Sequence, residues 1–252
     1  MLRRTPRFSR RFLKESQYTV QPKTKDELED IIIDTIENEG PECNLNFIDT
    51  SLITDMSYLF EDMEDFNGDI SQWNVSNVID MCGMFYGANK FNRPLNEWDV
   101  SNVENMCCMF RDAVSFNQPL NKWDVSNVLD MSYMFYDASS FNQPLNDWDV
   151  SFVADMRGMF RYASAFNQQL NKWDVSNVRN MAKMFYGAES FNKPLNDWDV
   201  SRVNNMTDMF YGAKAFNQDL NDWDVSHVKR TYKTGMFDGT KMKKLGKLPD
   251  WY

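Results

Sequence analysis

The chain has 252 residues, of which 42% are hydrophobic and 15% aromatic, and its net charge is −10 at pH 7. This charge argues against a nucleic-acid-binding protein, because phosphates would be repelled along most of the molecule. No run of about 18 apolar residues is present, so the sequence predicts no membrane-spanning helix.

The charges are segregated along the chain. Residues 1–25 contain eight basic side chains and one acidic one, and residues 227–252 contain seven and two. Residues 26–226 hold the remaining 12 basic and 34 acidic side chains, a net charge of −22. An acidic body with basic ends favours basic protein partners or divalent cations along its length.

The first 47 residues predict an arm and a capping helix. Residues 1–23 have no apolar stripe and are expected to form a basic flexible arm. Residues 9–14 resemble part of a twin-arginine export motif, but no apolar stretch follows, so we predict no signal peptide. Residues 24–47 are expected to form the N-terminal cap, with Thr24 and Glu27 at capping-box spacing. The helical stripe of this cap consists of Leu28, Ile31, Ile32 and Ile36.

Tryptophan recurs every 25 residues through most of the remaining chain. A fixed period of this length is the mark of a tandem array in which each copy packs on its neighbours. We assign seven 25-residue repeats to residues 48–222. Residues 223–252, where the pattern decays, are assigned to a degenerate C-terminal capping repeat. The recurring residues are Trp73, Trp98, Trp123, Trp148, Trp173, Trp198 and Trp223.

Each copy predicts a short strand followed by a short helix, as residues 95–121 illustrate. Trp98 and Val100 alternate with polar residues, which is the period of a half-buried strand. Asn105 is a good N-cap residue for the apolar stripe that follows it. That stripe has the spacing i, i+3, i+4 and i+7 of a two-turn helix, and consists of Met106, Met109, Phe110 and Ala113.

A strand, a helix and a turn in 25 residues are typical of a leucine-rich repeat. The spacing Leu95-x-x-Trp98-x-Val100-x-x-Val103 matches that motif, with Trp and Val in place of Leu. A parallel β-helix is the alternative, and the helical stripe argues against it. The predicted fold class is an α/β solenoid, a leucine-rich-repeat array. Short parallel strands are expected on its concave face and short helices on its convex face.

The repeat resembles that of BspA-like leucine-rich-repeat surface proteins, a family of 25-residue repeats. The string WDVSNV at residues 123–128 carries the resemblance, together with Met134-Phe135 and the residues that follow up to Asn146. The resemblance covers about residues 48–240 and includes a degenerate first copy at residues 52–60. It implies a bacterial surface or secreted protein that binds host or neighbouring-cell components.

The polar residues of the predicted strands form a ladder of Asp and Ser, one pair in each copy. Stacked carboxylates repel one another, so this ladder has two interpretations. It could bind a basic protein partner or divalent cations on the concave face. Alternatively, it could serve strand register through hydrogen bonds from the Ser hydroxyl or from a backbone N–H of the adjacent copy. The candidate ligand-binding residues are Asp99, Ser101, Asp124, Ser126, Asp149, Ser151, Asp174, Ser176, Asp199 and Ser201.

Nothing in the sequence predicts catalysis or a cofactor. His227 is the only histidine, and no nucleophile or phosphate-binding loop accompanies it. The four cysteines lack metal-ligand spacing. Cys82 and Cys107 lie one period apart and could pair, although free thiols are the favoured interpretation.

These observations predict a non-enzymatic protein-interaction or adhesion module that presents a repeated concave Asp/Ser surface. The alternative is an intracellular structural scaffold whose basic arms dock to an acidic surface.

Overall fold

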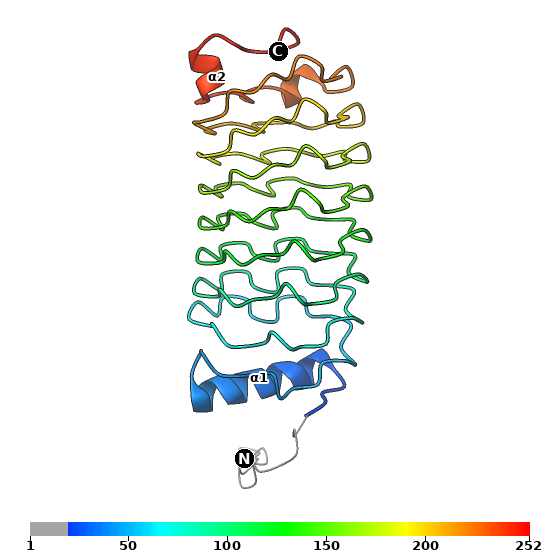
Figure 1. The fold of residues 1–252 in the computed structure, drawn as a ribbon, viewed down its shortest axis with the longest axis vertical. Helices are drawn as coiled ribbons and strands as arrows, with labels where there is room; N and C mark the ends of the chain where they lie inside the picture. The colour runs from blue at the N-terminus through cyan, green and yellow to red at the C-terminus, as the bar shows by residue number, and fades with distance from the viewer. Residues whose placement is uncertain (1–19) are drawn as a thin grey trace.

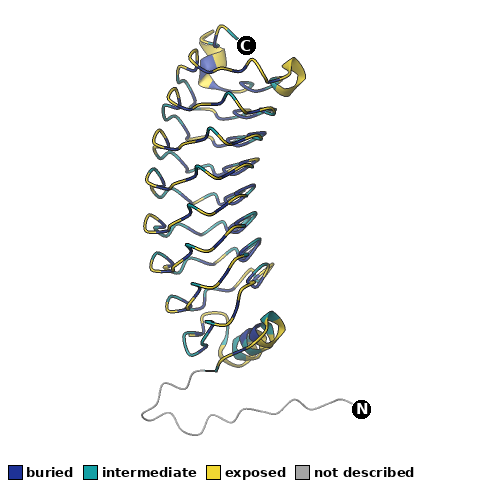
Figure 2. Cartoon of the chain, turned by 90° about the vertical axis from the view of Figure 1, so that its right-hand side faces the viewer, coloured by how far each residue is buried: buried dark blue, intermediate teal, exposed yellow. Residues whose placement is uncertain are grey.

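The structure is a computed structural model that describes residues 20–252. The chain winds into coils stacked along one axis, with α1 (Lys25–Glu39) and the C-terminus at opposite ends of the stack (Figure 1). A second view shows that this stack is gently curved (Figure 2). We call each 25-residue turn of the chain a coil.

Neighbouring coils are joined by parallel backbone contacts. Isolated β-bridges connect residues 25 positions apart, and backbone N–H groups donate to carbonyls of the following coil, as Phe110 does to Met134 at 2.9 Å. Each coil therefore satisfies its backbone through its neighbours. The bridges link, in order, Asp55, Asp80, Asn105, Asp130, Asp155, Asn180 and Asn205.

The short helices predicted in each copy are not found. Within residues 20–252, the helices are α1 (Lys25–Glu39), the 3₁₀ turn η1 (Arg230–Tyr232) and α2 (Lys241–Lys244). In the segment predicted to be helical, Cys108 and Asp112 have φ angles of 56° and 58°. A right-handed helix requires negative φ throughout, so two left-handed residues turn the chain instead. The preceding coil has Gly83 and Gly87 at the same two positions, again with positive φ.

The predicted strands are also shorter than expected. Ser101 and Asn102 form a turn directly after Val100, so the alternating stretch ends after three residues. The bridges fall on the Asp or Asn expected to cap a helix, such as Asn105, rather than on the Trp–Val segment. No extended sheet among the described residues defines the concave strand face that the sequence predicted.

The side chains predicted to be buried are nevertheless buried. Trp98, Val100, Val103 and the whole stripe from Met106 to Ala113 contribute to one continuous core. Successive turns closed by i to i−3 hydrogen bonds, such as Met109 N–H to the Met106 carbonyl, return a side chain inward every three or four residues. The helical spacing is thus reproduced without a helix.

Aromatic rings stack from coil to coil within this core. Phe110 lies 4.0 Å from Phe116 and 5.6 Å from Phe135, centroid to centroid. Trp148 stacks on Trp123 at 6.3 Å, and its Nε1 donates to the Leu120 carbonyl at 3.0 Å. This bond gives the buried indole N–H its partner.

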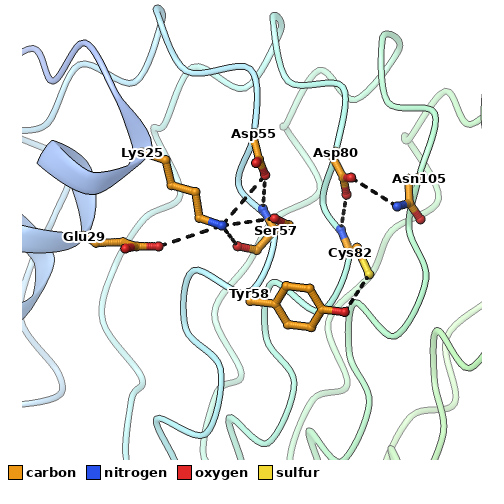
Figure 3. A network of polar contacts seen from close by, with 8 residues as sticks. All are labelled: Lys25, Glu29, Asp55, Ser57, Tyr58, Asp80, Cys82 and Asn105. Carbon is orange, nitrogen blue, oxygen red and sulfur yellow. Dashed lines mark hydrogen bonds and ion pairs between the residues drawn. The ribbon is translucent and has the colours of Figure 1, made fainter.

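Helix α1 covers the N-terminal end of the stack. Thr24 Oγ1 accepts from the backbone N–H of Glu27, as the capping-box spacing predicted. Leu28 and Ile32 are buried against the first coil. Lys25 reaches Asp55 and Ser57 of that coil (Figure 3). Helix α1 lies within residues 24–47, where the cap was predicted, and the arm predicted for residues 1–23 lies mostly outside the described residues.

The C-terminal end is closed by Trp251. Its Nε1 donates to the Leu220 carbonyl at 2.8 Å, and its ring stacks on Trp223 at 6.4 Å. Trp251 therefore takes the place of the tryptophan of a further coil. Met236 and Phe237, displaced by two residues from the 25-residue register, are buried beside it.

Candidate interaction surfaces

Every residue of the predicted Asp/Ser ladder lies in a turn on the surface. Asp99 Oδ1 accepts from the backbone N–H of Ser101 at 3.2 Å and from its hydroxyl at 2.6 Å. These bonds lie within one coil, rather than between coils as the structural interpretation supposed. Each is an Asx turn, in which a side-chain oxygen holds the backbone two residues on. The same backbone bond joins Asp124 to Ser126, Asp149 to Ser151, Asp174 to Ser176 and Asp199 to Ser201.

A different residue connects the coils along this ladder. Asn102 Nδ2 donates to the Ser76 carbonyl at 2.7 Å, and Asn127 donates likewise to Ser101. Where an Asn follows the Ser, at residues 77, 102, 127 and 177, it thus links its turn to the turn before it. Asn74 replaces Asp in its own coil and accepts from Ser76 in the same way, so the turn does not require a charge.

Serine hydrogen bonds lower the pKa of three ladder carboxyls, those of Asp49, Asp199 and Asp224. The Ser51 hydroxyl, and then its backbone N–H, lower the pKa of Asp49, and Ser201 does the same for Asp199. A carboxyl whose folded-state pKa is lowered contributes stability above its unfolded pKa of about 3.9. That contribution is lost as the pH falls through the folded-state pKa.

We expect Asp124→Ala to destabilise the protein by about 0.5–2 kcal/mol, because the Ser126 N–H loses its side-chain acceptor, as at a helix N-cap. Asp124→Asn keeps an acceptor oxygen and should change stability by less than about 0.5 kcal/mol. Urea denaturation of both variants measures the difference. Equal losses would show that the negative charge, rather than the acceptor, holds the turn.

A second surface, which the sequence interpretation missed, carries tyrosine and arginine. The residues that directly follow the Met–Phe pairs of residues 84–210 form a column. Within it, the Arg111 guanidinium lies between two tyrosine rings. Its Cζ is 4.8 Å from the Tyr86 centroid and 4.7 Å from that of Tyr136. Arg161 contacts Tyr136, Tyr162 and Tyr186 at 4.9–5.2 Å. We call this column with its neighbours the Tyr/Arg face: Tyr58, Tyr86, Arg111, Tyr133, Tyr136, Arg157, Arg161, Tyr162, Tyr186 and Tyr211.

Glycines allow the rings of the tyrosines beside the column to lie against the backbone of the next coil. A Cβ added to Gly158 would meet the Tyr133 ring at 2.4 Å, and one added to Gly187 would meet the Tyr162 ring at 2.5 Å. Each ring therefore covers a glycine of the next coil. Tyr133 and Tyr162 themselves have positive φ, a conformation that costs energy in a non-glycine residue.

Carboxyls next to the column are partly shielded from water. Burial raises the pKa of Asp112 although Arg111 contacts it at 3.3 Å, and burial also raises the pKa of Asp137. Arg161 Nε is buried and has no hydrogen-bond partner. The Tyr/Arg face thus holds cations, rings and carboxyls in fixed positions.

One pattern in the sequence could have revealed this face. The position after the Met–Phe pair reads Tyr, Arg, Tyr, Arg, Tyr, Tyr over six successive copies. Large side chains that differ from copy to copy at one position of a repeat are not needed for packing and therefore indicate an interaction surface. The predicted helix gave no reason to single out this position, because it lies outside the apolar stripe.

The cysteines are all free thiols. Cys82 donates to the Tyr58 hydroxyl at 3.2 Å (Figure 3), and the Cys107 and Cys108 sulfurs lie 3.5 Å apart. The hydrogen bond from Cys108 lowers the pKa of Cys107 to about 6. The alternative of a Cys82–Cys107 disulfide is not present in the structure.

The described residues contain neither a cluster of metal-ligand side chains nor a helix that could span a membrane. Within residues 20–252, no three His, Cys, Asp or Glu side chains are grouped as metal ligands. In the same range, no helix has the length and apolarity needed to cross a membrane.

One protein-family model matches the chain twice, over residues 35–148 and 136–251. The family is described as Mycoplasma protein of unknown function, DUF285. This chain belongs to that family. The two successive matches agree with a repeat protein, while the BspA-like resemblance is not named by the family and stays a prediction. No curated protein and no solved structure matches the chain.

Proposed function

We propose that this chain is a non-enzymatic protein-interaction or adhesion module, a solenoid with leucine-rich-repeat spacing. Its coils act as a scaffold, and the Tyr/Arg face is the surface that contacts a protein partner. The observation that carries the proposal is the Tyr–Arg–Tyr–Arg–Tyr–Tyr column with the exposed tyrosines beside it. This replaces the Asp/Ser ladder as the leading contact surface, because the ladder residues already bond within their own turns.

Physical chemistry supports this surface for protein binding. Tyrosine and arginine are enriched among the residues that contribute most to protein–protein affinity. Here their side chains are held by contacts with one another before any partner arrives. Such preorganisation reduces the conformational entropy lost on binding. Tyr58, Tyr162 and Tyr211 are also among the few large hydrophobic residues that the coils leave exposed.

The proposal can be tested with a variant that removes two exposed rings, Tyr162→Ala with Tyr211→Ala. Partners captured by the wild-type chain from extracts of cells that express it would be identified by mass spectrometry. Their affinities would then be measured by surface plasmon resonance. We expect the double variant to bind at least about 30-fold more weakly, the loss typical of interface residues worth 2 kcal/mol or more.

The control carries Lys122→Ala and Asp197→Ala, two exposed side chains that directly precede core tryptophans. It should bind with wild-type affinity. If the tyrosine variant folds and retains full affinity, the Tyr/Arg face is not the contact surface. If both variants lose affinity equally, the effect is not specific to that face.

A further inference from the structure

Two shallow hollows lie beside the Asp/Ser ladder, and none of the residues that line them belongs to the Tyr/Arg face. One hollow of about 460 Å³ is lined by residues of the first three coils, including Ser51, Leu52 and Ile79. Another, of about 360 Å³, is lined by Arg179, Ser201, Arg202 and His227. Both use the same repeat positions, which follow the ladder Ser and the next core Val. We call these two positions, taken along the coils, the groove.

Backbone hydrogen bonds hold one wall of the groove in register. Ile79 N–H donates to the Thr54 carbonyl at 2.8 Å, Glu104 to Ile79 at 2.9 Å, and Leu129 to Glu104 at 2.8 Å. These bonds join adjacent coils, so the side chains follow one another at roughly the 4.8 Å spacing of bridged backbones. The wall is therefore built before any ligand binds.

The groove is apolar at one end and cationic at the other. Its first five coils leave Leu52, Ile79, Leu129 and Phe152 exposed. All the exposed large hydrophobic residues within residues 48–222 lie either here or on the Tyr/Arg face. The later coils instead carry Arg179, Arg202, His227 and Lys229 at the same two positions.

Phe152 is the clearest case of a groove residue that does not stabilise the stack of coils. In neighbouring coils this position holds Asn127 and Asn177, whose amides bond to carbonyls of the preceding coil at 2.7 Å. Phe152 cannot donate that bond, and its side chain is 64% exposed. Phe152 joins Leu52, Ile79 and Leu129 as exposed apolar side chains along the groove, and exposed apolar residues that cluster in this way mark interaction sites.

The charges beside the apolar end determine which partner fits. Asp99, Asp124 and Asp149 follow the groove along its length, and Glu104 lies within it between Ile79 and Leu129. The net charge of −22 over residues 26–226 also attracts cations from a distance. We propose that the apolar end of the groove binds a segment of a partner protein in which Lys or Arg side chains alternate with large apolar ones.

Dimensions limit the length of that segment. Leu52 and Phe152 are four coils apart, about 19 Å at 4.8 Å per coil, which an extended peptide of about six residues spans. Beyond Phe152, Arg179 and Arg202 repel further basic side chains, so the cationic end stops the segment. This proposal does not depend on the Tyr/Arg face.

The probe for this test is a phage-displayed library of random 12-residue peptides, selected on the immobilised full chain. We expect enrichment of peptides that combine Lys or Arg with Leu, Phe or Trp. A labelled enriched peptide would then be titrated by fluorescence anisotropy. Its affinity should fall as salt rises, because the acidic ladder is screened.

Three variants connect this binding to the groove. Ile79→Ser with Leu129→Ser and Phe152→Asn should weaken it at least about tenfold, since buried apolar contacts are lost. Glu104→Lys should weaken it by repulsion. Phe152→Asn alone also tests the site, because it restores the amide of neighbouring coils and should not impair folding.

The Tyr162→Ala, Tyr211→Ala variant should bind the peptide as the wild type does, which separates this test from that of the Tyr/Arg face. The absence of enriched peptides, enrichment of acidic ones, or unchanged affinity in the folded groove variants would overturn the proposal.

Discussion

Trp148→Ala should lower the free energy of unfolding by about 3–5 kcal/mol, the range for deleting a large aromatic residue from a core. Trp148 is only 3% exposed and lies in the middle of the array. The substitution leaves a cavity beside Trp123 and removes the donor that bonds the Leu120 carbonyl. Urea denaturation followed by circular dichroism measures the loss.

The matched control is Asp147→Ala, which changes the adjacent, exposed residue. Asp147 contacts Lys172 at 2.8 Å on the surface. Exposed ion pairs of this kind are worth about 0–1 kcal/mol, so the control should lose no more stability than that.

We expect the unfolding of the Trp148 variant to divide into two stages, since each coil contacts mainly its neighbours. A loss below about 1 kcal/mol for the Trp148 variant would contradict the packing described above.

Leu28→Ala with Ile32→Ala should detach α1 from the first coil. Both side chains are fully buried, and truncations of this kind cost about 2–5 kcal/mol each. The detached helix would expose the apolar end of the stack around Ile48, so we also expect aggregation. Size-exclusion chromatography and thermal denaturation report the two effects.

Ile33→Ala provides the control within the same helix. Ile33 is 45% exposed, so its truncation should change stability by less than about 0.5 kcal/mol and leave the protein monodisperse. If the double variant behaves like this control, α1 does not cap the stack, and the first coil is stable without it.

The Asp/Ser ladder illustrates how far sequence reasoning reached at the candidate site. Its residues lie on the surface, one pair in each coil from residue 99 to residue 201. The bonding geometry differs, because Asp99 bonds to Ser101 of its own coil while Asn102 makes the contact between coils. The sequence pattern cannot distinguish a bond within one coil from a bond between coils, since both require Asp and Ser at the same spacing.

The Tyr/Arg face and the groove were not predicted. Their residues are variable among the copies, so a search for the shared pattern passes over them. Arg111 can contact Tyr86 and Tyr136 only because the coils bring residues 25 apart to within 5 Å. The pattern after each Met–Phe pair was visible in the sequence, but its contacts depend on the stacking.

By itself, the sequence determined the 25-residue period, the inward-facing side chains and the N-terminal helix. These follow from hydrophobic spacing and local capping, which residues close together in the sequence specify.

The tertiary structure decided the backbone path inside each coil. Residues such as Cys108 and Asp112 adopt positive φ, which isolated residues disfavour. Inter-coil hydrogen bonds, such as Asp112 N–H to the Tyr136 carbonyl at 2.7 Å, stabilise it there. Those bonds exist only when coils stack, so no single copy could reveal that its helical pattern encodes a series of turns.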